Sequence, residues 1–181
     1  EDAEPEQEEK KTESKEAEKT PQNNTKPLVE KIELCAPVSG TVKALSDVPD
    51  KTFAEKVLGD GAAIIPEEGK VYAPADGTVA NIMDSKHGIM FVTDSGAEVL
   101  IHIGLDTVNL KGKYFKSYVS DGDKVKKGTL LVEFDLEAIK GEGYNLITPM
   151  VVTNISDYIK AVCMEKENTA INAGDKFLTV V

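Results

Sequence analysis

The sequence predicts an all-β domain, an antiparallel barrel/sandwich hybrid with a duplicated hairpin motif and one or more short helices. Three observations support this fold class. Short runs rich in Val, Ile and Leu recur from residue 26 onward, separated by Gly, Pro and Asp. One heptapeptide recurs with two residues changed, and helical content is expected to be small, with one short segment as the best helix candidate.

The first 25 residues differ in composition from the rest of the chain. They contain no Val, Ile, Leu, Met or aromatic residue, and nine acidic residues face four lysines, so they contribute −5 of the net charge of −11. Such a segment buries nothing that could offset the entropy lost on ordering. We expect residues 1–25 to be a disordered acidic tail or an interdomain linker, and residues 26–181 to be the folded domain.

In each copy of a repeated heptapeptide, Ala-Pro ends an extended segment, two residues form a turn, and Gly-Thr-Val starts a strand. The sequence APVSGTV at residues 36–42 returns as APADGTV at residues 73–79, 37 residues later. In each copy the proline suits a turn because its φ is already restricted, and the glycine can adopt a positive φ. A third turn-strand unit occupies residues 119–135. We therefore expect two related halves built from duplicated hairpins.

The best helix candidate is the segment DKTFAEKVLG, residues 50–59. Its apolar residues Phe53, Val57 and Leu58 are spaced by four and five, and Gly59 is a typical helix stop. The spacing predicts a short helix with one apolar face.

Charge and hydropathy exclude several classes of partner. A net charge of −11 argues against nucleic acid, because phosphates would be repelled. No run of about 18 apolar residues exists, so we expect no direct insertion into a membrane. The two cysteines, Cys35 and Cys163, lack the spacing of metal or redox motifs, which favours free thiols in the reducing cytoplasm.

The chain has only two histidines, His87 and His102, and both lie in one predicted hairpin. If its loop consists of Asp94 and Ser95, the two histidines face each other with Cβ atoms roughly 5 Å apart. If the loop has three residues, with Gly96 in a bulge, the register slips by one and the histidines need not share a face. Both registers remain open at this point.

Small and acidic residues surround the histidines in the sequence. Gly88 follows His87, and Gly104 lies two residues after His102, so we expect each glycine to remove a side chain beside an imidazole. Asp106 has the same strand parity as His102 and Gly104. The pattern predicts an open strand face with a charge at its edge.

Two kinds of chemistry suit a pair of imidazoles. Zinc accepts neutral imidazole nitrogens, but a third ligand such as an aspartate would be required. Alternatively, one ring nitrogen is a nucleophile that forms a phosphohistidine, and the second imidazole donates a hydrogen bond to the phosphoryl oxygens. Histidine suits this role because a neutral ring nitrogen is available near pH 7.

The segment HIGLDTVNLKGKYF, residues 102–115, closely resembles the phosphorylation motif of the glucose-type enzyme IIA (EIIA) domains of the bacterial phosphoenolpyruvate-dependent sugar phosphotransferase system. Residues 32–89 resemble the N-terminal half of that family, and VEFDLEAIK and LITPMVVTN, residues 132–140 and 146–154, resemble the remainder. The resemblance covers about residues 30–181. The acidic tail resembles the linkers that join EIIA to other enzyme II domains.

The resemblance implies roles for individual residues. His102 would be phosphorylated on Nε2, and His87 would donate a hydrogen bond to the phosphoryl group. Ser85, where the family often has Thr, would hold the His87 ring in one tautomer. The side that faces partner proteins would include acidic and apolar residues of two segments: Asp50, Phe53, Val57, Leu58, Gly104, Asp106 and Val108.

The implied function is that of a cytoplasmic phosphotransferase component. It would accept a phosphoryl group from the phosphorylated carrier protein HPr and pass it to a cysteine of an EIIB domain, which phosphorylates the incoming sugar, with an EIIC membrane domain fused or separate. No cofactor is expected beyond the covalent phosphoryl group. Zinc bound between His87 and His102 would be adventitious and is not required.

Three other interpretations remain. A zinc peptidase of related β architecture would carry an H-x-H pair, which HIG replaces here. A biotinyl or lipoyl carrier would need a lysine at a hairpin tip in an M-K-M or D-K-A context, and Lys86 lies in SKH instead. The third is a regulatory EIIA-like domain fused to a sugar transporter, which has the same site and differs in where the phosphoryl group goes.

Overall fold

The computed structural model describes residues 31–181, and the predicted tail over residues 1–25 lies outside them, as do residues 26–30. The strands are β1 (Ile32–Cys35), β2 (Gly40–Ala44), β3 (Asp60–Pro66), β4 (Lys70–Tyr72), β5 (Gly77–Ile82), β6 (Gly88–Thr93), β7 (Glu98–His102), β8 (Phe115–Ser117), β9 (Lys124–Val125), β10 (Leu130–Phe134), β11 (Thr148–Val152), β12 (Ala161–Cys163), β13 (Ala170–Ile171) and β14 (Lys176–Val180). The helices are α1 (Lys51–Ala54) and α2 (Leu136–Gly141), with 3-10 turns η1 (Leu45–Asp47), η2 (Thr107–Leu110) and η3 (Ile155–Asp157).

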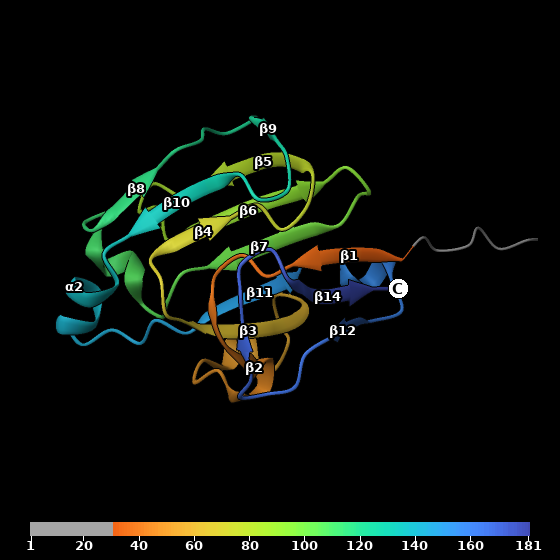
Figure 1. Ribbon diagram of the computed structural model, residues 1–181, viewed down its shortest axis with the longest axis horizontal. Coiled ribbons are helices and arrows are strands. Elements are labelled where there is room, and N and C mark those ends of the chain that lie inside the picture. Colours follow the sequence, from red (N-terminus) through yellow and green to blue (C-terminus); the bar gives the residue numbers. More distant parts are fainter. Residues whose placement is uncertain (1–30) are drawn as a thin grey trace, which may run out of the picture.

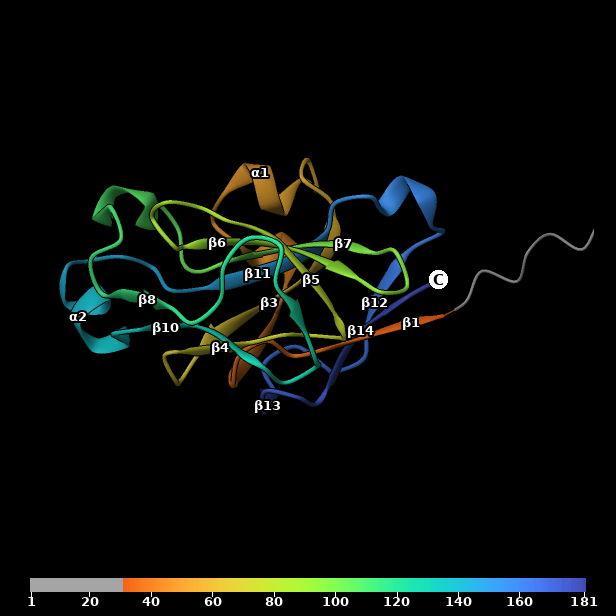
Figure 2. The same ribbon diagram turned by 90° about the horizontal axis from the view of Figure 1, so that it is seen from above.

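The strands form one large sheet and two small ones. Eight strands pair in the order β13-β2-β3-β11-β7-β6-β5-β9, and the small sheets have the orders β1-β14-β12 and β4-β10-β8. The small sheets lie on one side of the large sheet, whereas α1 lies on the other side (Figure 2). Strand β1 and the C-terminus lie at the same end of the molecule (Figure 1). The predicted all-β, sandwich-like fold class is confirmed.

Two apolar clusters fill the two sides of the large sheet. The larger lies between the sheets and includes Leu34, Phe91 and Phe177, which are essentially inaccessible to solvent. The smaller lies under α1 and includes Phe53, Leu100 and Val151. Adjacent residues of β7 therefore serve different clusters, because successive side chains of a strand point to opposite faces.

The two copies of the heptapeptide repeat are bonded to each other. The residue before each copy donates its backbone N–H to the proline carbonyl of the other copy. Cys35 donates to Pro74 at 2.8 Å, and Tyr72 donates to Pro37 at 2.8 Å. Such reciprocal bonds relate the two copies by an approximate two-fold rotation.

The glycine of each copy allows a neighbouring strand to approach closely. A Cβ on Gly40 would lie 1.9 Å from the carbonyl oxygen of Ile65, and one on Gly77 would lie 2.2 Å from that of Val92. Both glycines begin strands, as predicted. A side chain at either position would push two paired strands apart.

The two-fold relation extends through the strand registers. Leu34 of β1 pairs with Leu178 of β14, and in the same way Val71 of β4 pairs with Val132 of β10. Val71 lies 37 residues after Leu34, and Val132 lies 46 residues before Leu178. The β2–β3 pairing returns in β5–β6, and the β3–β11 pairing returns in β6–β7. The duplication expected from one heptapeptide therefore covers most of the β framework.

One strand departs from the two-fold relation. In β5, Val79 pairs with Phe91 and Asn81 pairs with Met90, so Ala80 is an extra residue that β2 lacks. Asp121 accepts hydrogen bonds from the backbone N–H of Ile82 at 2.7 Å and from the side chain of Asn81 at 3.0 Å. This β-bulge shifts the chain by one residue just before the turn that leads to His87.

The helix predicted over residues 50–59 is shorter than expected. Asp50 caps α1 by accepting a hydrogen bond from the N–H of Thr52 at 2.9 Å, but α1 ends at Ala54 and Lys56 already has a φ of 58°. Val57 and Leu58 are exposed, so burial does not stabilise a continued helix. In the described part of the chain, neither α-helix has the length and apolarity needed to cross a membrane.

Candidate functional site

His87 and His102 meet at one end of the β6–β7 hairpin. Their ring centroids are 4.8 Å apart and their planes are inclined at 81°, so the edge of one ring faces the other. The two histidines come from neighbouring segments of the large sheet: His102 ends β7, and His87 immediately precedes β6.

Of the two registers that the sequence left open, the structure has the one with a three-residue loop. Gly88, not His87, pairs with His102, and the loop has three residues with Gly96 at a φ of 98°. The histidines still share a face because His87 comes out of a turn, where Lys86 has a φ of 59°, and does not follow strand alternation. The carbonyl of His87 accepts a hydrogen bond from the N–H of Ile103 at 2.7 Å.

A backbone carbonyl determines the tautomer of His102. Nδ1 of His102 lies 2.6 Å from the carbonyl oxygen of Gly104. Because a carbonyl oxygen can only accept, Nδ1 must carry the proton of the neutral ring, and the lone pair is on Nε2. No sequence pattern identifies this hydrogen bond, because its acceptor is a main-chain atom.

Burial and nearby carboxylates act in opposite directions on His102. Burial lowers its pKa below the ordinary value, whereas the hydrogen bond to Gly104 and the charges of Asp50 and Asp106 raise it. The net lowering keeps the ring neutral near pH 7, so Nε2 is available as a nucleophile. The two aspartates approach from different segments, one at the start of α1 and one before η2.

His87 is more deeply buried than His102 and has only 4% of its surface exposed. Burial, together with the neighbouring His102, lowers the pKa of His87 to about 4. In residues 31–181, its Nδ1 atom has no hydrogen-bond partner. The expected hydrogen bond from Ser85 is therefore not formed in this structure, although Ser85 lies in the turn that leads to His87.

The two glycines act differently from the sequence-based expectation. A Cβ on Gly104 would meet Thr107 Cγ2 at 2.8 Å and the carbonyl of Asn145 at 3.0 Å, and a Cβ on Gly88 would meet Met83, so neither glycine makes room beside an imidazole. The strand also ends at His102, so Gly104 and Asp106 do not follow the alternation expected of it. Gly104 is needed for its φ of 73° and for its carbonyl position.

The predicted partner-facing residues separate into buried and exposed groups. Phe53 is 3% exposed and packs on the ring of His102 with centroids 5.2 Å apart, so it supports that ring from the core and does not face a partner protein. In contrast, Val57, Leu58 and Val108 are 69%, 38% and 49% exposed. Large exposed apolar side chains that form a patch are typical of a docking surface.

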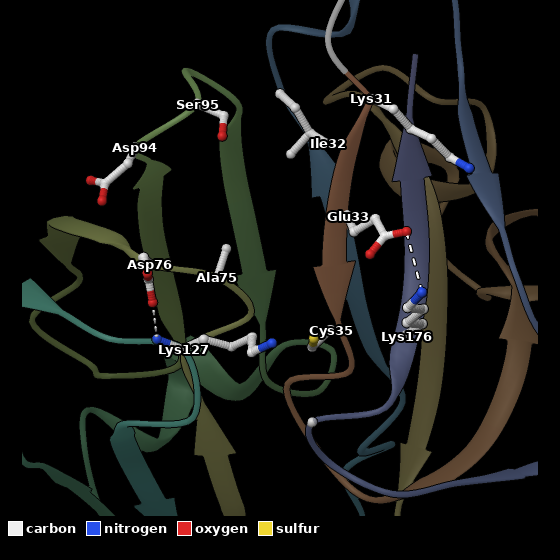
Figure 3. Close-up of a pocket in the computed structure, with 11 residues that line it drawn as sticks. Lys31, Ile32, Glu33, Cys35, Ala75, Asp76, Asp94, Ser95, Lys127 and Lys176 are labelled. Carbon is white, nitrogen blue, oxygen red and sulfur yellow. Dashed lines mark hydrogen bonds and ion pairs between the residues drawn. The ribbon is translucent and has the colours of Figure 1, made fainter.

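A separate cleft of about 500 Å³ lies at the opposite end of the β6–β7 hairpin (Figure 3). It opens between β1 and the turns that carry Asp76 and Asp94, and Cys35 lies at its floor. Glu33 and Lys176 form an ion pair across one wall at 3.4 Å. The cleft includes none of the residues that the sequence analysis selected as site residues.

The histidine pair does not form a metal centre with other side chains of the described residues. Nowhere in residues 31–181 do three or more His, Cys, Asp or Glu side chains converge in a way that could hold a metal ion. Because Nδ1 of His102 is bonded to Gly104, that ring offers only Nε2 to any ligand. The donor set does not match a resident metal site, which usually has three or four protein ligands.

Comparison with known proteins shows a consistent family. Residues 32–158 match the family described as phosphoenolpyruvate-dependent sugar phosphotransferase system, EIIA 1. The chain is 46% identical over 146 residues to a glucose-specific EIIA component of Halalkalibacterium halodurans, covering 81% of this chain and 83% of that protein.

A longer relative and a solved structure also match the chain. The chain is 53% identical over 123 residues to a beta-glucoside-specific EIIBCA component of Bacillus subtilis, covering 68% of this chain but only 20% of that protein. It therefore spans about a fifth of such fused relatives. The solved structure of glucose permease IIA from Mycoplasma capricolum superposes with a TM-score of 0.74 at 32% identity, covering 83% of this chain and 96% of that one.

Proposed function

The chain belongs to the EIIA 1 family of the phosphoenolpyruvate-dependent sugar phosphotransferase system, and from this premise we propose that it carries a phosphoryl group on Nε2 of His102. The donor is phosphorylated HPr, and the acceptor is a cysteine of an EIIB domain. The observation that carries the proposal is the 2.6 Å contact between Nδ1 of His102 and the Gly104 carbonyl, which leaves Nε2 unprotonated.

In the first step, the lone pair of Nε2 attacks the phosphorus of the phosphohistidine of HPr in line with the bond that breaks. The N–P bond of HPr breaks, and its electron pair returns to the donor nitrogen. The phosphorylated His102 ring then carries phosphorus on Nε2 and a proton on Nδ1. The Gly104 carbonyl, Asp50 and Asp106 stabilise the positive character of this ring.

In the second step, the thiolate of an EIIB cysteine attacks the same phosphorus from the opposite side. The bond from phosphorus to Nε2 breaks, its electron pair returns to Nε2, and the neutral ring with a proton on Nδ1 is restored. No net proton transfer at His102 is required in either direction. A reversible relay of this kind needs an accessible phosphoryl group, and His102 is only half-buried.

His87 is the proposed hydrogen-bond donor to the phosphoryl oxygens. Its ring lies 4.8 Å from that of His102, and its low pKa keeps it neutral, with one N–H to donate. In residues 31–181, Nδ1 of His87 has no hydrogen-bond partner and is therefore free to accept one. We propose that the Ser85 hydroxyl turns toward Nδ1 and donates to it when the phosphoryl group binds. The proton of the His87 ring is then on Nε2, which donates to the phosphoryl oxygens. Ser85 thus keeps its proposed orienting role in the phosphorylated state alone.

The proposed docking surface consists of Val57, Leu58 and Val108 with Asp50 and Asp106 beside them. Apolar side chains supply buried area in a complex, and the acidic residues favour a partner with a basic patch. The relatives that fuse EIIA with EIIB and EIIC support these two domains as partners. We place the domain in the cytoplasm, at the membrane face where EIIC is attached.

The test is transfer of labelled phosphate from phosphoenolpyruvate through enzyme I and HPr. We expect His102→Ala to accept no label, whereas His87→Ala accepts it and passes it to EIIB slowly. Ser95→Ala, an exposed change at the far end of the same hairpin, is the matched control and should behave like the wild type. Label that persists in His102→Ala would refute the assignment, and loss of acceptance only in His87→Ala would exchange the two roles.

A further inference from the structure

Thr107 carries a buried hydroxyl group that the proposed transfer does not use. The residue lies in η2, is fully inaccessible to solvent, and donates a hydrogen bond from Oγ1 to the carbonyl of Ile103 at 2.5 Å. A hydroxyl in an apolar surrounding is costly unless it forms such a bond. The bond closes the turn that immediately follows His102.

The backbone of Ile103 connects this turn to both histidines. Its N–H donates to the carbonyl of His87 at 2.7 Å, and its carbonyl accepts from Thr107. Ile103 also follows His102 directly in the chain. One residue is thus held on one side by the segment of His87 and on the other by the Thr107 hydroxyl.

Gly104 lies between two anchored peptide groups. On one side is the Ile103 carbonyl, held by Thr107, and on the other is the N–H of Leu105, which donates to the carbonyl of Asn145 at 2.8 Å. The methyl group of Thr107 lies 2.8 Å from where a Gly104 Cβ would be. Glycine is the most flexible residue, so its φ of 73° is maintained by these neighbours and not by its own preference.

We propose that Thr107 is a positioning residue for His102. Through the Ile103 carbonyl, its hydroxyl holds the Gly104 carbonyl against Nδ1 of His102 and thereby keeps the proton on Nδ1 and the lone pair on Nε2. Without this bond the turn loosens, the carbonyl moves away, and the ring populates the tautomer with its proton on Nε2. That tautomer cannot attack phosphorus through Nε2, so the consequence for transfer depends on the proposed function.

The test compares Thr107→Val, which replaces the hydroxyl by a methyl of similar size, with Thr107→Ser, which keeps the hydroxyl. The first measurement is nitrogen-15 NMR of the imidazole rings in the unphosphorylated protein, which reports the tautomer directly. We expect the wild type and Thr107→Ser to show His102 protonated on Nδ1, and Thr107→Val to show a substantial fraction protonated on Nε2. A change that only altered stability would leave the tautomer of the folded protein unchanged.

The second measurement is the rate of phosphate acceptance from phosphorylated HPr. We expect Thr107→Val to be slower by about tenfold. This factor corresponds to the loss of one hydrogen bond that favours the His102 tautomer with its proton on Nδ1. Thr107→Ser should be close to the wild type. Because the tautomer is measured without phosphate, a wild type that fails to label at His102 would refute the proposed function while leaving the tautomer comparison intact.

Two outcomes would overturn the positioning role. One is a folded Thr107→Val protein whose His102 remains protonated on Nδ1, and the other is a Thr107→Ser protein that shows the mixed tautomer despite its hydroxyl. If Thr107→Val does not fold, Thr107→Ala replaces it, since it removes the hydroxyl without placing a methyl group against the Ile103 carbonyl. The same two tautomer results then decide.

Discussion

The two halves of this domain share strand registers but not chemistry. Where β6 and β7 bring His87 and His102 together, the related positions at β3 and β11 hold Asp60 and Val151. Asp60 forms an ion pair with Lys56 at 3.3 Å, and Val151 is fully buried. The same backbone therefore holds a candidate reactive centre in one half and a part of the core in the other.

Loop length accounts for much of this difference. The chain between β2 and β3 contains η1 and α1, which pack over Val151 through Leu45 and Phe53. The chain between β5 and β6 is a short turn that leaves His102 half-exposed. Because Phe53 also contacts His102, the long connection of one half supports the site of the other. Duplication supplied two equivalent sheet ends, and unequal loops made them different.

The largest expected effect comes from comparing alanine variants at two related positions, one in each half. His102→Ala should abolish phosphate acceptance with little change in stability, since its ring is half-exposed. Val151→Ala at the related position should retain acceptance and lose about 2 kcal/mol of unfolding free energy, because two buried methyl groups are removed. Labelling and denaturant titration check the pair, and loss of acceptance in a folded Val151→Ala would erase the contrast.

Acid should destabilise the half with the histidines. The folded pKa of His87 is about 4, below its ordinary value, so the unfolded chain binds a proton first as pH falls. The contribution of neutral His87 to the free energy of unfolding is fully present above pH 6.5 and is lost between about pH 6.5 and 4. The loss from this residue is about 3 kcal/mol. Burial shifts the pKa of His102 in the same direction. Denaturant titrations at several pH values should show this loss, and His87→Ala should remove most of it; an unchanged slope would contradict the assignment.

A side chain at Gly104 should be less well tolerated than one at another left-handed glycine. Gly104→Ala would place a methyl group against Thr107 and the Asn145 carbonyl, so we expect a loss of about 2–3 kcal/mol and a changed His102 tautomer. Gly122→Ala is the matched control, because Gly122 has a φ of 88° with open space around it, and it should cost about 1 kcal/mol. In the other half, Thr153 follows the related strand and carries a side chain at the corresponding position. Equal losses in the two alanine variants would show that the surroundings of Gly104 do not matter.

The smallest effect is expected at the bulge that distinguishes β5 from β2. Asp121→Ala removes the acceptor for Ile82 and Asn81. Because the site is exposed, we expect a loss of only about 1 kcal/mol of unfolding free energy. Amide exchange should rise at Ile82, and transfer to EIIB should slow several-fold through the turn that carries His87. Asp123→Ala, which removes a hydrogen bond to Ser120 outside the bulge, is the control. Equal amide exchange at Ile82 in both variants would contradict the role of Asp121 in holding the bulge and the turn that carries His87.

The sequence alone determined the fold class, the duplication and the two histidines. The Gly-Thr-Val strand starts were predictable from the repeat, but the reason expected for their glycines was wrong. Neither Gly40 nor Gly77 has a positive φ, and each is required because a carbonyl of the neighbouring strand lies where its Cβ would be. The histidine pairing was predictable in kind, since both residues lie in one hairpin. These features depend on local turn chemistry and on the period of two that every strand follows.

Only the tertiary structure decided the register, the tautomer and the exposure of individual residues. The three-residue loop and the turn before His87 depend on left-handed backbone at Gly96 and Lys86, which several residue types could adopt or avoid. The Gly104 and Ile103 carbonyls are main-chain groups that every residue carries, so the sequence could not predict their hydrogen bonds to His102 and Thr107. Phe53 and Val57 look alike in a helical pattern, and only packing buries one and exposes the other. The register and the tautomer depend on backbone conformation and on main-chain acceptors, which a pattern of residue types does not encode. The exposure of a side chain depends on packing against residues far away in the chain, as Phe53 does against Leu100 and Val151.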